Sequence, residues 1–203
     1  MKLYDSKTAP NPRRVRIFLA EKGISVPTEQ VDIAGKQNRG AEYAAKNPLM
    51  GVPILELDAG GVTAETVAIC RYSEKPQPTP PLMGADARDK AVVEMWQRRM
   101  ELNVMSCITG AFRHGNAFFA DRIAQVPAYA EQCLKEVPAA YDFLDRTLAK
   151  SKFIAGDRYT IADITAQCSV DFARVIRVKI DPDKHPNLAR WHAEVSARPS
   201  AQA

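Results

Sequence analysis

The sequence lacks long apolar stretches, paired cysteines and metal-ligand spacings. No apolar run in its 203 residues approaches the roughly 20 residues that a membrane-spanning helix needs. The start, Met1–Asp5, has no apolar segment of the kind found in secretory signals. The four cysteines are far apart and form neither a CxxC pair nor a Cys/His cluster. We therefore expect no membrane association, no bound metal and a reducing, cytoplasmic setting.

A strong charge bias is also missing. The formal net charge is +4, and both halves of the chain carry acidic and basic residues in similar numbers. The short basic cluster Arg13–Arg16 would point in several directions on a helix, so it forms no basic face. This pattern predicts no nucleic-acid partner. The composition, 46% apolar and 26% charged, is that of an ordinary globular protein.

Proline is concentrated between residues 75 and 81, in the run Lys-Pro-Gln-Pro-Thr-Pro-Pro. Such a run cannot continue a helix or lie in a central strand, and it favours a stiff, extended connector. We therefore predict one domain over residues 1–76, a linker over 77–86 and a second domain over 87–203.

The periodicity of apolar residues differs between the two parts. Before the proline run, strands are expected at Lys2–Asp5, Thr28–Ile33, Pro53–Asp58 and Val62–Ala64, and helices at Pro12–Lys22, Gly40–Lys46 and Glu65–Glu74. After it, only helices are expected, at Asp86–Phe112, Ala128–Lys150, Ile161–Val175 and Pro186–Ala197, with a kink or break at Pro138. The pattern predicts an α/β domain of order β-α-β-α-β-β-α followed by an all-helical domain.

Three short segments of the first part contain residues suited to chemistry, and each also has a purely structural interpretation. Asn11-Pro12 is a good helix N-cap, but a helix start after a strand also stabilises a bound anion, to which the Asn11 amide can donate. Val52-Pro53 opens a strand, either as an ordinary trans proline or as a rigid cis turn.

The third segment, Glu65-Thr66, stands where a strand gives way to a helix. Its structural interpretation is helix capping by Thr63 or Thr66. Its functional interpretation is a clamp for an amino acid: Thr66 would hold a carboxylate at the helix N-terminus, and Glu65 would face the neighbouring ammonium group.

Taken together, these segments resemble the cytosolic glutathione S-transferase family over essentially the whole chain. The resemblance depends on residues 14–23, on Asn47-Pro48 with Val52-Pro53, on Glu65-Thr66 before residues 68–72, and on residues 153–163 with the capping box Thr160-x-x-Asp163. It implies a thioredoxin-like first domain that binds glutathione as co-substrate, a helical-bundle second domain that binds a small apolar substrate, and a homodimer.

The resemblance also implies roles for individual residues. Pro53 matches the family's cis-proline, and the backbone of Val52 would pair with the cysteinyl part of glutathione. Glu65 and Thr66 would hold its γ-glutamyl end. The second-substrate pocket is assigned to Arg99, Asn103 and Phe112 on the first long helix of the helical domain.

The sequence departs from the family at the position that contacts the sulfur. The usual serine of the theta and zeta classes falls on Ala9, which cannot donate a hydrogen bond. Bacterial nu-class enzymes, with an Asn two residues after a Thr, are the most similar, and their Asn falls on Asn11. We therefore predict Asn11 as the thiolate donor, with Thr8 and Ser6 as alternatives. Tyr4 lies near a tyrosine of other classes but suits a core position equally well.

A second departure affects the glycyl end of glutathione. Many members carry Gly-Lys or Gly-Gln before the Val-Pro pair, where this chain has Met50-Gly51. Lys36, Gln37 and Arg39 are the nearest polar substitutes. Three functions fit these residues: a glutathione-dependent transferase acting on electrophiles, a glutathione-dependent disulfide reductase, and a ligand-binding protein without catalysis.

Overall fold

The computed structural model describes residues 1–203, which form two compact units: residues 1–82 with 199–203, and residues 83–198. The proline run lies at the end of the first unit, whereas the last five residues belong with the first unit and not with the helices that precede them.

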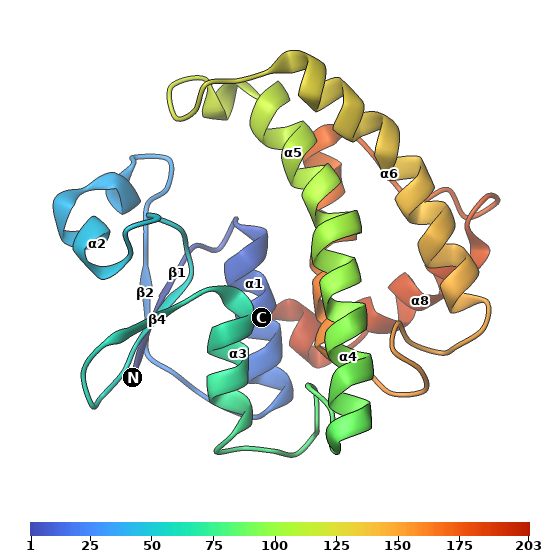
Figure 1. Cartoon of the computed structure of the whole chain (residues 1–203), viewed down its shortest axis with the longest axis horizontal. Helices are drawn as coiled ribbons and strands as arrows, with labels where there is room; N and C mark the ends of the chain where they lie inside the picture. The colour runs from blue at the N-terminus through green and yellow to red at the C-terminus, as the bar shows by residue number, and fades with distance from the viewer. The chain divides into compact units, whose positions relative to one another are not determined.

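The first unit contains a four-stranded sheet of order β2-β1-β3-β4 (Figure 1). Its strands are β1 (Lys2–Asp5), β2 (Thr28–Gln30), β3 (Ile54–Glu56) and β4 (Val62–Ala64). β1 runs parallel to β2 and antiparallel to β3, and β3 is antiparallel to β4. The predicted order β-α-β-α-β-β-α is confirmed, although β2 and β3 are shorter than predicted.

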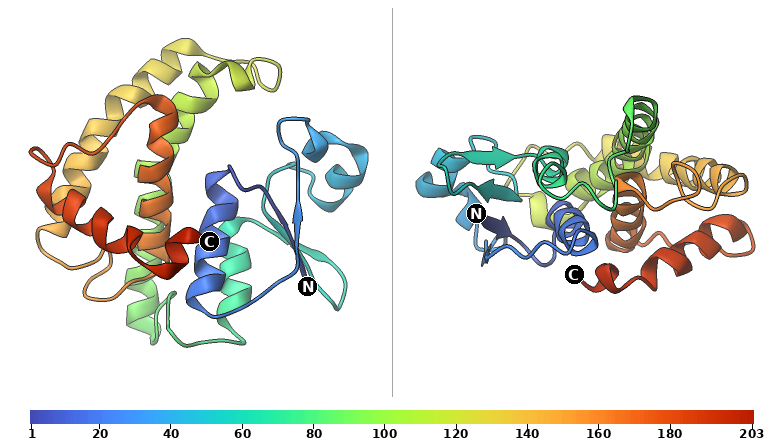
Figure 2. Two further views of the ribbon diagram at one scale, coloured as in Figure 1. Left: turned by 180° about the vertical axis from the view of Figure 1, so that it is seen from behind. Right: turned by 90° about the horizontal axis from the view of Figure 1, so that it is seen from below.

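Helices cover both faces of this sheet. α1 (Pro10–Glu21) and α3 (Thr66–Glu74) lie side by side, as Figures 1 and 2 show. The short helix α2 (Ala41–Lys46) follows the single turn η1 (Gln37–Arg39). Tyr43 of α2 packs with Tyr4, Val31 and Ile54 in a buried cluster, and the Tyr4 and Tyr43 rings meet edge to face at 6.2 Å.

The end of the chain completes this first unit. The turn η5 (Pro199–Gln202) packs on α1. The Arg13 guanidinium donates to the carbonyl of Ala201 at 3.2 Å, and the Ser200 hydroxyl donates to the Glu21 carboxylate. These contacts cover part of α1, and no sequence pattern indicated them.

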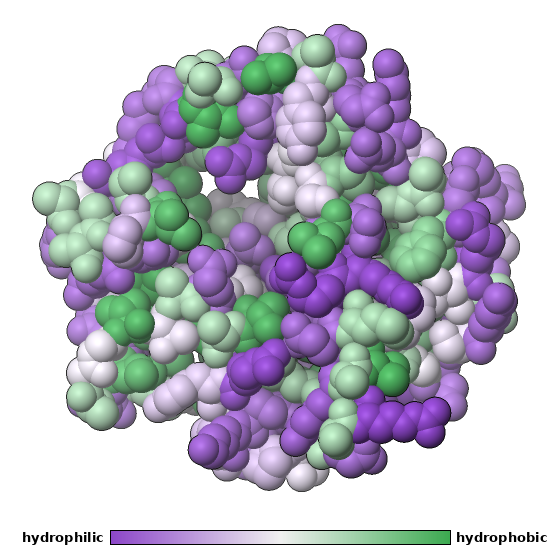
Figure 3. Space-filling model, in the orientation of Figure 1, coloured by the Kyte–Doolittle hydropathy of each residue, from purple (hydrophilic) through white to green (hydrophobic).

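The second unit is all-helical, as predicted. It contains α4 (Ala87–Arg99), the π-helical segment η2 (Met100–Met105), α5 (Ser106–Gly115), α6 (Pro127–Leu148), α7 (Ile161–Phe172) and α8 (Pro186–Ser196), with short turns η3 (Ala117–Phe119) and η4 (Ala173–Ile176). None of the helices is both long and apolar enough to cross a membrane. On the face drawn in Figure 3, apolar and hydrophilic side chains are interspersed.

α7 is the central helix of the second unit, because residues 161–170 are all buried. Its start is the predicted capping box. The backbone N–H of Thr160 donates to Asp163 Oδ2 at 2.9 Å, and the N–H of Ala162 donates to Thr160 Oγ1 at 3.3 Å. Asp163 also accepts from Trp191 Nε1 on α8 at 3.0 Å. One carboxylate therefore joins two helices.

The helix predicted over Asp86–Phe112 is interrupted by the π segment η2. Three side chains donate to backbone carbonyls in this region. Asn103 Nδ2 donates to the carbonyl of Arg99 at 3.3 Å, and the Ser106 hydroxyl donates to that of Leu102. Cys107 Sγ donates to the carbonyl of Val104 at 3.1 Å. Such side chains compete with the regular helical ladder, which accounts for the wider turn. α6 in contrast continues through Pro138 without a break. Pro138 is exposed, so water can reach the carbonyl that lacks its helical partner.

α5 and α6 approach closely at Gly110. A Cβ at this position would lie 2.6 Å from Cys133 Sγ and 3.4 Å from the Tyr129 ring. We expect Gly110→Ala to lower the free energy of unfolding by about 1–3 kcal/mol, because the helices must separate or Cys133 must leave its rotamer. Urea unfolding checks this. The double variant with Cys133→Ala should recover part of the loss, and equal losses in both variants would contradict the steric explanation.

Candidate functional site

The three segments singled out in the first unit lie together at one end of the strands of its sheet. Tyr4 in β1 pairs with Ile54 in β3, and Ile54 pairs with Ala64 in β4. The loop after β1, the Val52-Pro53 turn before β3 and the Glu65-Thr66 junction after β4 therefore lie at the same end of neighbouring strands. α1 and α3 both begin at this end (Figure 1).

Asn11 lies in the first turn of α1, but it is not the N-cap that the sequence predicted. The helix begins at Pro10, and Ala9 is the N-cap without a side-chain hydrogen bond. Proline is as well suited to position 10 as to position 12, because N–H groups in the first turn have no helical partner to lose. The Asn11 side chain is therefore not needed to cap the helix.

The Asn11 amide has a defined orientation. Arg14, which is buried, donates from Nη1 to Asn11 Oδ1 at 3.1 Å. Since the guanidinium can only donate, it fixes the oxygen on its own side and leaves Nδ2 as a donor for another group. The half-buried amide thus presents N–H groups at the start of α1, where the helix dipole is positive.

The alternatives to Asn11 differ in exposure. Ser6 is buried, and its carbonyl accepts from the N–H of Ala9 at 3.1 Å. Thr8 is exposed in the loop between β1 and α1. Tyr4 is a core residue, whose hydroxyl donates to Glu56 Oε2 at 2.7 Å. The geometry leaves Ser6 and Thr8 as alternatives and assigns Tyr4 to the core.

The Val52-Pro53 peptide bond is cis, as the family resemblance predicted. The loop before it is held by Asn47, which belongs to one of the motifs found in the sequence, and by Tyr43 and Asn38, which no motif indicated. Tyr43 Oη and Asn47 Nδ2 both donate to the carbonyl of Gly51 at 2.9 Å, and Asn38 Nδ2 donates to the carbonyl of Met50 at 2.7 Å. Only the Asn47-Pro48 pair gave a turn signal for this loop.

Glu65 has a positive φ of 70°, which is uncommon for any residue but glycine. It is the N-cap of α3, and no side chain caps this helix, so the predicted capping by Thr63 or Thr66 is wrong. The buried Thr66 is the first helical residue. Its N–H group lies in the turn that has no helical acceptors and is available to a ligand. The strained backbone is typical of functional sites.

Lys36, Gln37 and Arg39 are exposed in the loop after β2. β2 is parallel to β1, so this loop follows the strand end that lies at the same edge of the sheet. Gln37 is partly used within the loop, because its Oε1 accepts from the N–H of Asp32 at 2.8 Å. The loop with the three predicted substitutes therefore lies at the same end of the strands as the Val52-Pro53 turn and the Glu65-Thr66 junction.

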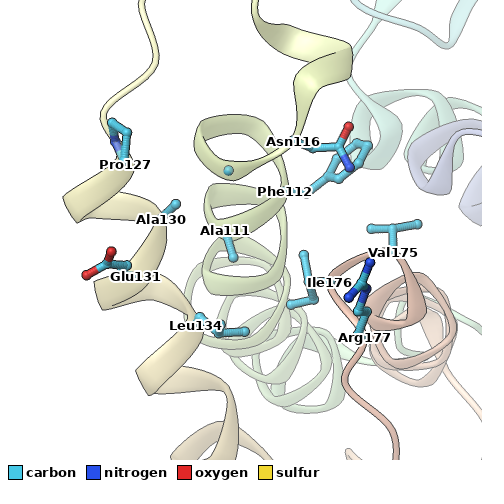
Figure 4. A pocket seen from close by; sticks show the side chains of 11 residues that line it. Ala111, Phe112, Asn116, Pro127, Ala130, Glu131, Leu134, Val175, Ile176 and Arg177 are labelled. Atoms are coloured by element: carbon cyan, nitrogen blue, oxygen red, sulfur yellow. The ribbon is translucent and has the colours of Figure 1, made fainter.

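The three residues predicted for a second-substrate pocket lie on successive segments of the second unit, namely the end of α4, η2 and α5. The Arg99 guanidinium lies over the Trp96 ring at 4.6 Å, and Asn103 is exposed on η2. Phe112 packs against Phe119 and Phe172 at 5.3 and 5.2 Å and lines a cavity of about 440 Å³ between α5, α6 and η4 (Figure 4). Arg99 and Asn103 do not line that cavity.

All four cysteines, Cys70, Cys107, Cys133 and Cys168, are free and buried. Burial raises the pKa of the Cys107 thiol to about 11, so this group is a thiol at neutral pH. No three histidine, cysteine or carboxylate side chains come together as a metal site.

The end of the sheet where α1 and α3 begin offers hydrogen-bond donors and two helix N-termini. Such an arrangement binds anions.

Comparison with known proteins agrees with this arrangement. Residues 8–75 match the glutathione S-transferase N-terminal domain, and residues 104–199 match the glutathione S-transferase C-terminal domain. Glutathione S-transferase 2 of Saccharomyces cerevisiae is 30% identical over 207 residues, covering 100% of this chain and 88% of the yeast protein.

Solved structures extend the similarity to three dimensions. A glutathione S-transferase domain-containing protein from Marinobacter aquaeolei VT8 superposes with a TM-score of 0.94 at 38% identity, covering 98% of this chain and 99% of the other. A glutathione S-transferase from Methylobacillus flagellatus, solved with glutathione bound, gives a TM-score of 0.84 at 28% identity, covering 99% of this chain and 96% of the other. The chain therefore belongs to the glutathione S-transferase family.

Proposed function

We propose that this chain is a glutathione transferase that binds glutathione as its thiolate and transfers it to a small, largely apolar electrophile. The observation that carries the proposal is the meeting of the cis Val52-Pro53 turn, the start of α1 and the start of α3 at one sheet edge. The family's relatives, among them yeast glutathione S-transferase 2, support it.

Each segment has a part of the tripeptide to bind. The backbone of Val52, which forms no hydrogen bond within the chain, pairs with the cysteinyl unit. The Thr66 hydroxyl and N–H donate to the γ-glutamyl carboxylate at the start of α3, and Glu65 accepts from the γ-glutamyl ammonium. Lys36, Gln37 and Arg39 remain the candidates for the glycyl carboxylate.

The thiol is activated by stabilising its anion. A free cysteine thiol has a pKa of about 8.5, so only a few per cent is ionised at pH 7. The Asn11 amide donates to the sulfur and, with the positive end of α1, lowers that pKa. An amide is not a base at neutral pH, so the proton leaves to solvent. The thiolate then forms a bond to an electrophilic carbon, and the leaving group departs with its electron pair.

Disulfide reduction is a second candidate, favoured by the same amide. A thiolate stabilised by Asn11 is also the species that attacks a disulfide sulfur, giving a mixed disulfide and releasing the other thiolate. No additional acid or base is required for that step. The donor at Asn11 is therefore compatible with conjugation and with reduction, and substrates must separate the two.

The first experiment is an absorbance titration of the purified chain with glutathione near pH 7, followed by assays with 1-chloro-2,4-dinitrobenzene and with 2-hydroxyethyl disulfide. We expect saturable thiolate absorbance and conjugation of the aryl halide. Thiolate formation with turnover of the disulfide alone would favour the reductase. A chain that binds glutathione without turnover of either substrate would be a ligand-binding protein.

Thr66→Val tests the γ-glutamyl clamp. We expect the Kd for glutathione to rise about tenfold to a hundredfold, because a hydrogen bond to a charged carboxylate is worth about 1.5–3 kcal/mol. Isothermal titration calorimetry measures it. Thr63→Val, in the adjoining strand β4, is the matched control and should bind as the wild type does. Equal affinity for Thr66→Val and the wild type would remove Thr66 from the site.

The wider context of this proposal comes from the family. We propose that the chain acts in the cytoplasm as a homodimer. Residues 1–76 form the glutathione domain. Residues 87–203 bind the second substrate through Arg99, Asn103 and Phe112. The four buried free cysteines suit a reducing compartment. Sedimentation equilibrium tests the dimer directly: a mass near 22.4 kDa at micromolar concentration would contradict it.

A further inference from the structure

The cavity of the second unit has an apolar lining. It holds about 440 Å³ between α5, α6 and the turn η4, and the side chains of Ala111, Phe112, Leu134 and Ile176 face it (Figure 4). Leu134 of α6 is 43% exposed, so its side chain is open to a ligand entering from solvent. A volume of this size is within the range of pockets for small molecules.

Two hydrogen-bond donors without partners also line this cavity. The Arg177 guanidinium forms no ion pair or hydrogen bond within the chain, and Asn116 uses only its Oδ1, which accepts from the N–H of Phe118 at 2.9 Å. The Asn116 Nδ2 group is therefore left as a donor. Figure 4 shows both side chains on the same side of the cavity, next to Phe112 and Val175.

The placement of Arg177 follows from the backbone. Arg177 ends η4 with a φ of 62°, and the N–H of Val178 donates back to the carbonyl of Ala173 at 3.1 Å. Glu131, the acidic residue of the lining, forms no ion pair with Arg177, and Figure 4 shows the two residues on opposite sides of the cavity. The cavity thus combines an apolar body with two donors at one end, one of them a permanent cation.

We propose that this cavity binds a small apolar carboxylate of one or two rings, with its carboxylate on Arg177 and Asn116 and its rings against Phe112, Leu134 and Ile176. A guanidinium and an amide match the two oxygens of a carboxylate, and the apolar lining matches a body without further polar groups. The site involves residues 111–177 only, so it does not depend on glutathione binding.

The test compares 2-naphthoate with the neutral 2-naphthamide, by calorimetry on the full chain without glutathione. We expect 2-naphthoate to bind one per chain. Arg177→Asn should weaken 2-naphthoate about tenfold or more while leaving 2-naphthamide unchanged, since asparagine tolerates the left-handed backbone. Arg174→Asn, an exposed arginine of the same turn outside the cavity, is the matched control and should bind both probes as the wild type does.

A second variant and a mapping experiment guard against a folding artefact. Leu134→Glu places a carboxylate at an exposed position of the lining and should abolish 2-naphthoate binding with an unchanged circular dichroism spectrum. Amide chemical-shift changes on adding 2-naphthoate should cluster in residues 111–134 and 173–178. The proposal is overturned if 2-naphthoate does not bind at millimolar concentration, if Arg177→Asn weakens both probes equally, or if the shifts lie elsewhere.

Discussion

Replacing Asn11 with alanine is expected to lower kcat/KM for glutathione conjugation at pH 7 by about tenfold to a hundredfold. The first turn of α1 has two side-chain donors, and Arg13 donates to the carbonyl of Ala201, whereas Arg14 orients the Asn11 amide with Nδ2 outward. A preorganised donor to a developing or bound anion is typically worth a factor of this size or more. The loss should appear chiefly in kcat/KM at neutral pH.

The pH profile distinguishes thiolate stabilisation from a loss of packing. Without the amide, the apparent pKa of the enzyme–glutathione complex, read from kcat/KM for the electrophile at saturating glutathione, should rise by about one to two units, which corresponds to about 1.4–2.7 kcal/mol. Activity at high pH, where glutathione ionises unaided, should then approach that of the wild type. Thr8→Ala and Ser6→Ala are the comparison variants. An unchanged Asn11→Ala profile together with a shifted Thr8→Ala or Ser6→Ala profile would move the assignment to that hydroxyl.

Asp163→Ala is expected to lower the free energy of unfolding by about 3–5 kcal/mol. The carboxylate is fully buried and accepts four hydrogen bonds, from the N–H of Ile154, the N–H and hydroxyl of Thr160, and Trp191 Nε1. Truncation would leave these donors unpaired in the core, where each costs about 1–3 kcal/mol. Urea denaturation measures the loss, and a loss below 1 kcal/mol would show that water replaces the carboxylate.

Asp163 also predicts an unusual pH dependence. Burial raises its pKa from 3.8 to about 6, against the hydrogen bonds that lower it. Between pH 4 and 6 the folded state therefore holds a proton that the unfolded state has lost, so the stability contributed by Asp163 falls by about 3 kcal/mol as the pH rises through this window. It is constant above about pH 6.

Comparison with Asp163→Asn isolates this effect. The free energy of unfolding of the wild type, minus that of the variant, should decrease from pH 4 to pH 6. Asp142 is the matched control, because the hydrogen bond from His185, together with Lys184, lowers its pKa. The stability that Asp142 contributes is lost as the pH falls through that lowered pKa. Its pH dependence therefore has the opposite sign to that of Asp163. A wild-type advantage that grows from pH 4 to pH 6 would contradict the buried-carboxyl explanation.

The sequence predicted the order of elements because each strand and helix carries its own period of apolar residues. The bounds of an element were predicted less well where neighbouring residues suit the same position of a helix. Pro10 and Pro12 both suit a first turn, so the start of α1 was placed two residues late. The π segment η2 depends on side chains bonding to their own helix, which apolar periodicity does not report.

The candidate site was predictable only where the family has a motif. Pro53, Glu65 and Thr66 stand in such motifs, and the cis bond at Val52-Pro53 followed from one of them. Asn38 and Tyr43, which hold the loop before it, act through contacts that exist only in the folded chain. The same is true of the cavity with Arg177 and Asn116, which is assembled from segments more than 60 residues apart.

The turn η5 has a consequence for how the protein is made. Because residues 199–203 belong to the unit that begins at Met1, that unit is discontinuous in the chain. On the ribosome, α1 is synthesised early, yet the residues that cover it arrive only after the whole of the helical unit. Part of α1 therefore stays uncovered until residues 199–203 have been synthesised behind the helical unit, although domains usually fold in the order in which they emerge.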